Sequence, residues 1–148
     1  SNLFLSSGMM PLARYRAAGV PVGLGSDLAA GPELSIFSVM RAAAVTRRVL
    51  LLLAEEGGAR GAPRPLGPLD WLRLGTLDGA RALGMADAIG SLEVGKEADL
   101  ILVDPALTAP LAGAAELAEP EELMSRLIFR PHPDMVRGAW VRGKLLPA

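Results

Sequence analysis

The chain has 148 residues, of which 51% are hydrophobic and 21% charged, and its mean hydropathy of +0.34 excludes a disordered protein. Its net charge of −1 gives no electrostatic reason to expect nucleic acid or an anionic membrane as a partner. The absence of cysteine excludes disulfides, thiolate metal sites and a cysteine nucleophile. The longest apolar run, 49–54, is too short to span a bilayer, and no secretory signal opens the chain. We therefore expect a soluble, cytoplasmic protein. Because the sequence opens on an apolar run without methionine, we also expect a piece of a longer polypeptide.

The first half of the chain alternates helical and extended patterns. Apolar spacing predicts a helix over 10–18, ended by Gly19, and a buried parallel strand over 20–25, where apolar residues alternate. A loop of small residues (26–33) leads to a long helix over 34–56. Its predicted apolar face comprises Ile36, Phe37, Met40, Ala44 and Val45. This succession of helix, strand, loop and helix indicates an α/β fold, either a barrel or a doubly wound sheet.

The second half begins with a loop rich in glycine and proline (57–68), followed by short helices over 69–74 and 76–83. A turn-rich stretch (89–99) leads to a strand with a continuous apolar core over 100–104. After a loop over 106–118, we expect a helix over 120–129 and a hairpin over 135–146 that turns at Arg142-Gly143-Lys144. Composition changes near Asp87, so we divide the chain into an α/β part (1–86) and a mostly β part (87–148).

Asp27 is the most informative residue for function. It lies just beyond the predicted strand 20–25, and ligands of parallel α/β folds gather at the carboxyl ends of strands. Gly23 and Gly25 would allow close approach of the backbone there. We expect the carboxylate to face a cavity, where it could bind a divalent ion or accept a proton. The alternative is that Asp27 only caps a turn.

Three blocks of sequence carry a resemblance to a known family: Ser1-Asn2-Leu3-Phe4-Leu5-Ser6-Ser7-Gly8, Gly23-Leu24-Gly25-Ser26-Asp27 and Ile89-Gly90-Ser91-Leu92-Glu93-Val94-Gly95-Lys96-Glu97-Ala98-Asp99-Leu100. In this order they resemble the last third of deaminases of the amidohydrolase superfamily. The first block and the stretch from Asp27 to Ala43 look most like the guanine deaminase family. Triazine hydrolases and adenosine-type deaminases usually carry Ser-Asn-Asn after the aspartate, whereas Gly31-Pro32-Glu33 stands here.

The resemblance implies the C-terminal segment of a (β/α) TIM-type barrel, followed by strands of a small β-sandwich. It also implies one zinc ion in the complete enzyme, with Asp27 both as a metal ligand and as the catalytic group that takes a proton from zinc-bound water. The family's histidine ligands and its proton-shuttling glutamate have no counterpart in these residues. A single carboxylate cannot hold zinc, so we expect the chain alone to be metal-free and inactive. The implied reaction is hydrolytic deamination of guanine, a small purine, to xanthine and ammonia, and we expect the full-length enzyme to be a homodimer.

Other residues are assigned structural roles. His132, between two prolines, is expected in a surface loop, and Ser6 and Ser7 lack a histidine base. Support or packing roles are expected for Asn2, Trp71, Lys96, Asp99 and Trp140. Two alternatives to guanine deaminase stay open. One is a related aminohydrolase that acts on another purine, a pterin or a triazine, and the other is a non-catalytic module derived from such an enzyme.

Overall fold

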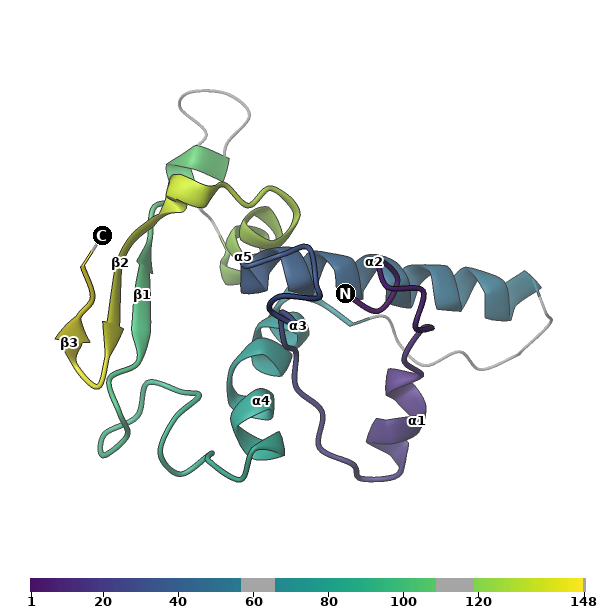
Figure 1. Cartoon of the computed structure of the whole chain (residues 1–148), viewed down its shortest axis with the longest axis horizontal. Coiled ribbons are helices and arrows are strands. Elements are labelled where there is room, and N and C mark those ends of the chain that lie inside the picture. Colours follow the sequence, from purple (N-terminus) through teal and green to yellow (C-terminus); the bar gives the residue numbers. More distant parts are fainter. Residues whose placement is uncertain (57–65, 109–118, 148) are drawn as a thin grey trace.

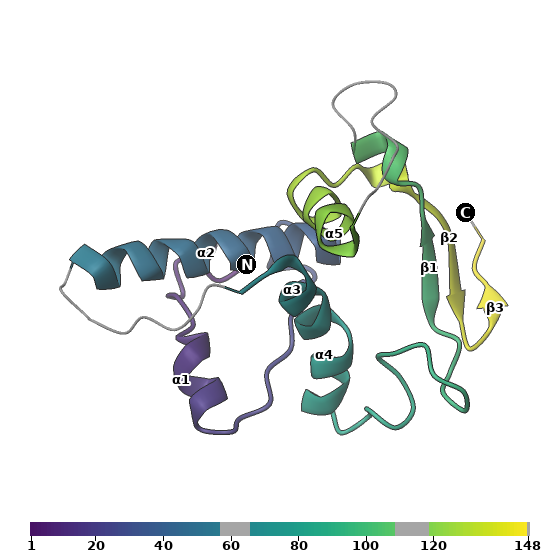
Figure 2. The ribbon, with the colours of Figure 1, turned by 180° about the vertical axis from the view of Figure 1, so that it is seen from behind.

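A computed structural model describes residues 1–56, 66–108 and 119–147 (Figure 1). In chain order the elements are α1 (Leu12–Ala17), α2 (Ile36–Glu56), α3 (Pro68–Gly75), α4 (Leu77–Ala82), β1 (Leu100–Val103), the 3-10 turn η1 (Pro105–Thr108), α5 (Pro120–Phe129), the 3-10 turn η2 (Pro133–Met135), β2 (Val136–Val141) and β3 (Lys144–Leu145). Helices α3, α4 and α5 lie in the middle of the molecule, α2 extends from there to one end, and the three strands form a separate sheet at the other end (Figures 1 and 2).

The core lies where α2, α3 and α5 meet, next to η2. Its buried members are Phe37, Met40, Ala44, Trp71, Leu74, Met124, Leu127, Ile128 and Met135. The α2 members of this cluster, Phe37, Met40 and Ala44, are three and four positions apart, as the predicted apolar face requires, and Ser38 and Val39 between them are buried as well. The inclusion of Val45 in that face is wrong, because one further residue turns the side chain by about 100° and leaves it 46% exposed.

Local signals set the helix boundaries close to those predicted. Proline opens both α3 and α5. An N–H at this first helical position has no intrahelical acceptor, so proline, which lacks the N–H, costs no hydrogen bond there. At the start of α3, the Gly67 N–H also donates to Asp70 Oδ2 at 2.9 Å. The bounds of α5 agree with the predicted 120–129, and α2 begins two residues later than predicted. No helix within the described ranges has the length and apolarity needed to cross a membrane.

The sheet is antiparallel, in the order β1-β2-β3. In β1 and β2, Leu100 pairs with Trp140 and Ile101 with Ala139. The predicted hairpin is confirmed: Arg142 and Gly143 join β2 to β3 with positive φ angles of 51° and 74°, as a tight two-residue turn requires. Although strand β1 is apolar throughout, Ile101 is 45% and Leu102 57% exposed, because no described element covers them.

The predicted strand 20–25 does not form within the described part of the chain. The segment is extended, but the sheet contains only β1, β2 and β3. Its Leu24 N–H donates to the Leu74 carbonyl oxygen, at the end of helix α3, rather than to a neighbouring strand. A parallel strand, as predicted here, requires a partner distant in sequence, and no described segment provides one. A barrel and a β-sandwich therefore remain implications of the resemblance, and the division at residue 86 stays a prediction from composition. Residues 57–65 and 109–118, within the predicted loops, lie outside the described residues; 105–108 form η1 instead of a loop.

Candidate functional site

The extended segment 22–25 connects the helical core to the loop that carries Asp27. The Leu24 N–H donates to the Leu74 carbonyl oxygen at 3.0 Å, and the Leu24 side chain packs against the core. Leu74 is itself only 2% exposed. The path of the backbone up to Gly25 is therefore tied to the buried end of α3.

Asp27 begins a tight turn just beyond this segment. Its φ of 55° is left-handed, a conformation that aspartate tolerates better than most residues. Its carbonyl oxygen accepts hydrogen bonds from the N–H groups of Ala30 at 3.0 Å and Gly31 at 2.6 Å. The side chain is exposed, and its carboxylate accepts no hydrogen bond from any residue in the described ranges. The backbone of Asp27 thus shapes the turn, while its carboxylate is available to a ligand.

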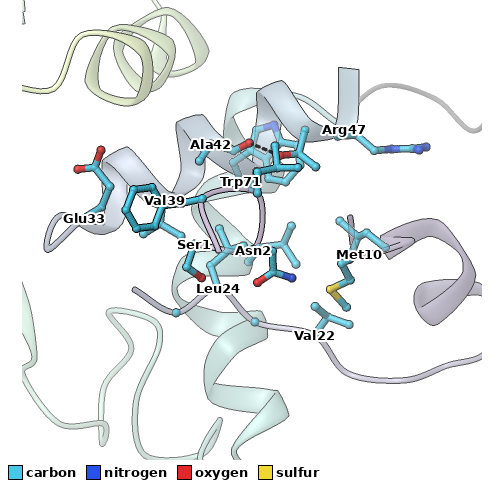
Figure 3. A pocket seen from close by; sticks show the side chains of 18 of the residues that line it. Ser1, Asn2, Met10, Val22, Leu24, Glu33, Val39, Ala42, Arg47 and Trp71 are labelled. Carbon is cyan, nitrogen blue, oxygen red and sulfur yellow. Dashed lines mark hydrogen bonds between the residues drawn. The ribbon is translucent and has the colours of Figure 1, made fainter. Parts of the chain in front are cut away.

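A cavity of about 300 Å³ lies beside the segment, between the N-terminal residues 1–4, α2 and Trp71 of α3 (Figure 3). Most of its lining is apolar, including Val22, Leu24, Val39 and Trp71. Gly25 lines this cavity, but Asp27, two residues later, does not. The cavity is on the α2 side of the segment, whereas Asp27 lies past the segment's end. Asp27 therefore does not face this cavity, and its expected place at a substrate cavity stays a prediction.

The cavity's polar lining comes from several elements. Asn2, Glu33, Arg47 and Thr46 line it (Figure 3). The Thr46 hydroxyl donates a hydrogen bond to the Ala42 carbonyl oxygen at 2.8 Å. Sequence analysis missed the contribution of α2. A stripe of small and apolar residues, 39, 43, 46 and 50, recurs at helical spacing beside the core face and could have indicated a second contact surface.

The remaining candidates have structural roles. His132 is an exposed residue before η2, where its Nδ1 accepts a hydrogen bond from the Asp134 N–H at 3.1 Å. Lys96 Nζ donates to Ser91 Oγ at 2.7 Å within the turn 89–99, and Asp99 Oδ1 accepts from the Arg142 N–H at 2.7 Å. These bonds hold the turn and the hairpin in place, which agrees with the interpretation of Lys96 and Asp99 as structural.

The backbone of Asn2, rather than its side chain, holds the N-terminal turn. Its backbone carbonyl oxygen accepts hydrogen bonds from both the N–H and the hydroxyl of Ser7, the latter at 3.2 Å. Ser6 has a positive φ of 54°, a backbone conformation typical of a turn residue. The Asn2 side chain makes no hydrogen bond to a described residue and lines the cavity instead. Ser6 and Ser7 are therefore turn residues, with no base beside them among the described residues.

The sequence profile of the amidohydrolase family matches residues 1–146, which is nearly the entire chain. The chain belongs to the amidohydrolase family. Two curated relatives match it over similar lengths. A probable guanine deaminase of Deinococcus radiodurans is 37% identical over 144 residues, which are 97% of this chain and 31% of that protein. A 5-methylthioadenosine/S-adenosylhomocysteine deaminase of Moorella thermoacetica is 38% identical over 149 residues, covering 100% of this chain and 31% of the relative. The chain thus spans about a third of the length of these relatives.

Solved amidohydrolase structures share the arrangement of the chain. The guanine deaminase of Bradyrhizobium japonicum superposes with a TM-score of 0.85 and 26% identity, covering 99% of this chain and 35% of that one. An adenosine deaminase of Xanthomonas campestris with bound zinc superposes with a TM-score of 0.72 and 34% identity, over 97% and 29% of the two chains. The packing described above is therefore also found within longer amidohydrolases.

The described residues do not by themselves fit a zinc site. Zinc in proteins takes about four ligands, or three and a water. No three His, Cys, Asp or Glu side chains in the described part of the chain lie close enough together to hold a metal ion. Asp27 could supply one carboxylate ligand, and any others would have to come from outside the described residues.

Proposed function

We propose that the chain is the part of a guanine deaminase that carries the aspartate which accepts a proton during hydrolysis. The observation that supports this most is the match of 97% of the chain to a probable guanine deaminase, together with the position of Asp27 in an exposed turn after segment 22–25. In the proposed reaction a water oxygen forms a bond to the ring carbon that bears the amino group. One proton of the water ends on the ring nitrogen beside this carbon and the other on the amino group. The carbon–nitrogen bond then breaks, ammonia leaves, and the carbon keeps the oxygen as the carbonyl of xanthine.

The chemistry gives Asp27 a defined task. Water is a poor nucleophile until it loses a proton, and a carboxylate within hydrogen-bonding reach can accept that proton as the bond to carbon forms. The side chain of Asp27 is exposed and makes no hydrogen bond to a described residue, so its oxygens are available for this transfer. The rest of the pocket for the purine would be supplied by the portion of an amidohydrolase that lies outside this chain.

Metal, assembly and location are further parts of the proposal. We propose one zinc ion in the complete enzyme, with Asp27 as one ligand, because amidohydrolases are generally metal-dependent and a structural neighbour contains zinc. A homodimeric full-length enzyme and a cytoplasmic location remain predictions from the sequence and its resemblance.

A second candidate function is deamination of 5-methylthioadenosine or S-adenosylhomocysteine. The Moorella relative favours it, with 38% identity over the entire chain. Two features favour guanine. The TM-score to the guanine deaminase structure, 0.85, exceeds the 0.72 to the adenosine deaminase structure, although sequence identity is higher to the latter, 34% against 26%. In addition, Gly31-Pro32-Glu33 stands after Asp27 where adenosine-type deaminases usually carry Ser-Asn-Asn.

Two chimeras test the substrate. In one, this chain replaces the matched segment of the Deinococcus relative, and in the other it replaces the matched segment of the Moorella relative. Ammonia release is measured from guanine for the first chimera and from 5-methylthioadenosine and S-adenosylhomocysteine for the second, each relative to its parent enzyme. We expect the Deinococcus chimera to retain the larger fraction of parental activity. Better retention in the Moorella chimera would favour the second candidate, and folded but inactive chimeras would favour a non-catalytic module.

The role of Asp27 is tested in the active chimera by Asp27→Asn. The amide has the same shape but cannot accept the proton, so we expect kcat to fall by at least about 100-fold. Asp87→Asn is the matched control, because Asp87 is an exposed aspartate with no ion pair to a described residue. It should leave kcat unchanged. Full activity of the Asp27→Asn protein would refute the proposed role.

A further inference from the structure

Two glycines bring the backbone of segment 22–25 into direct contact with α4. A β-carbon added at Gly23 would lie 2.6 Å from the Cα of Gly79 and 3.4 Å from its nitrogen, and real β-carbons essentially never approach within 3.0 Å of such atoms. The opposing atoms are backbone in a helix, so they cannot turn aside as the end of a side chain could. Residue 23 must therefore be glycine for the segment to lie where it does.

The contact is asymmetric. A β-carbon added at Gly79 would meet the Leu74 carbonyl oxygen at 3.4 Å and the Gly23 Cα at 4.0 Å, which are ordinary van der Waals distances. Alanine therefore fits at position 79, whereas a larger side chain would extend toward Gly23. The steric limit on the segment can thus be tested from two different elements.

A hydrogen bond next to Gly23 fixes the same region. The Leu24 N–H donates at 3.0 Å to the carbonyl oxygen of Leu74, a buried residue near the end of α3. Because segment 22–25 is not paired in the described sheet, this bond and the glycine contact are what connect its backbone to the helices. Asp27 follows only four residues after Gly23.

We propose that Gly23, Gly79 and the Leu24–Leu74 hydrogen bond form a positioning device that sets where the Asp27 carboxylate lies. The inference rests on the proposed function of Asp27 and assigns Gly23 and Gly79 as positioning residues. An Ala at residue 23 would push the segment away from α4 and carry Asp27 with it. A misplacement of about 1 Å at a catalytic group can cost about 100-fold in rate.

The test uses the chimera with the Deinococcus relative, with Gly23→Ala and Gly79→Val as two routes to the same displacement. We expect each to lower kcat by about 10- to 100-fold and to change KM much less, because the substrate pocket is mainly built elsewhere. Gly67→Ala is the control: it lies before α3, and its β-carbon would come no closer than 3.8 Å to the Asp70 carboxylate. If Gly23→Ala fails to fold, Gly79→Val still tests the same contact, because it changes the α4 side of it.

A double-mutant comparison separates positioning from general destabilisation. If Gly23 acts through Asp27, Gly23→Ala should cause little further loss in the Asp27→Asn chimera. Hydrogen exchange at the Leu24 amide should also be faster in both displaced variants and unchanged in Gly67→Ala.

The outcomes distinguish this inference from the proposed function. Full activity after Asp27→Asn, or a folded parent chimera without activity, would refute the proposed function and this inference with it. Loss of activity after Asp27→Asn combined with wild-type kcat in folded Gly23→Ala and Gly79→Val would refute the positioning device alone. An equal loss from Gly23→Ala with and without Asp27 would likewise refute it.

Discussion

At the scale of single residues, the turn after Asp27 depends on the absence of a side chain at position 31. A β-carbon at Gly31 would lie 2.4 Å from the Ser26 carbonyl oxygen, 3.0 Å from Ser1 Cβ and 3.1 Å from the Asp27 carbonyl oxygen. The Asp27 oxygen belongs to the turn itself, the Ser26 oxygen to the residue just before it, and Ser1 Cβ to the N-terminal segment. Gly31 therefore lets the chain close the turn and pack it against residue 1.

We expect Gly31→Ala to lower the free energy of unfolding of the 148-residue chain by about 1–3 kcal/mol, the usual cost of inserting a methyl group into filled space. Urea unfolding followed by tryptophan fluorescence at low protein concentration measures it. Gly25→Ala is the matched control, since a β-carbon there has no heavy atom within 4 Å. A Gly31→Ala protein as stable as the Gly25→Ala protein would show that the turn can relax without cost.

At the scale of elements, the end of β1 is tied to the start of β2 by a charged contact. Asp104 Oδ2 accepts from Arg137 Nη2 at 3.0 Å, and Asp104 Oδ1 accepts from the Ala106 N–H at 3.0 Å. The Ala106 hydrogen bond, and after it the Arg137 hydrogen bond, lower the pKa of Asp104 below its ordinary value of 3.8. Both bonds favour the ionised carboxylate in the folded state.

This pKa shift predicts an acid-sensitive contribution to stability. Because the folded pKa is below the unfolded one, the contribution is fully present above pH 3.8 and is lost as the pH falls from there through the lower folded value. We expect Asp104→Asn to reduce the urea midpoint near neutral pH and to converge with the unsubstituted chain in strong acid. Asp87→Asn, which removes an exposed aspartate, should have the same urea midpoint as the unsubstituted chain at each pH, so there is no difference that could converge. A difference between Asp104→Asn and the unsubstituted chain that stays constant with pH would contradict the linkage.

The elements also show which features a sequence can predict. Helix α5 was predicted with its observed bounds, and the hairpin at Arg142-Gly143 with its turn, because proline, glycine and apolar spacing act over a few neighbouring residues. The predicted strand 20–25 does not form, because a parallel strand needs a partner distant in sequence and no described segment pairs with it. The candidate site divides in the same way. The place of Asp27 at the end of an extended segment could be predicted, whereas the contact between Gly23 and Gly79 depends on packing between segments far apart in sequence.

At the scale of the molecule, many large apolar side chains are exposed on surfaces that a longer amidohydrolase could cover. Leu3 and Phe4, beside the cavity, are 51% and 67% exposed, and Leu52 and Leu53 on α2 are 59% and 52% exposed. Exposed apolar surface on this scale marks a site of association. The curated relatives are about three times as long as this chain, so other parts of such a polypeptide could bury these residues.

We therefore expect the 148-residue chain, prepared alone, to form concentration-dependent oligomers or aggregates, because association removes apolar side chains from water. Light scattering coupled to size-exclusion chromatography over a range of concentrations measures it. The double variant Phe4→Ser with Leu52→Glu should shift the distribution toward monomer, since it makes both exposed surfaces polar. Leu92→Glu is the matched control: Leu92 is 78% exposed but lies in the turn 89–99, away from α2 and the cavity. A sharp monomer peak for the unsubstituted chain at every concentration would show that these apolar surfaces are stable in water without a covering partner.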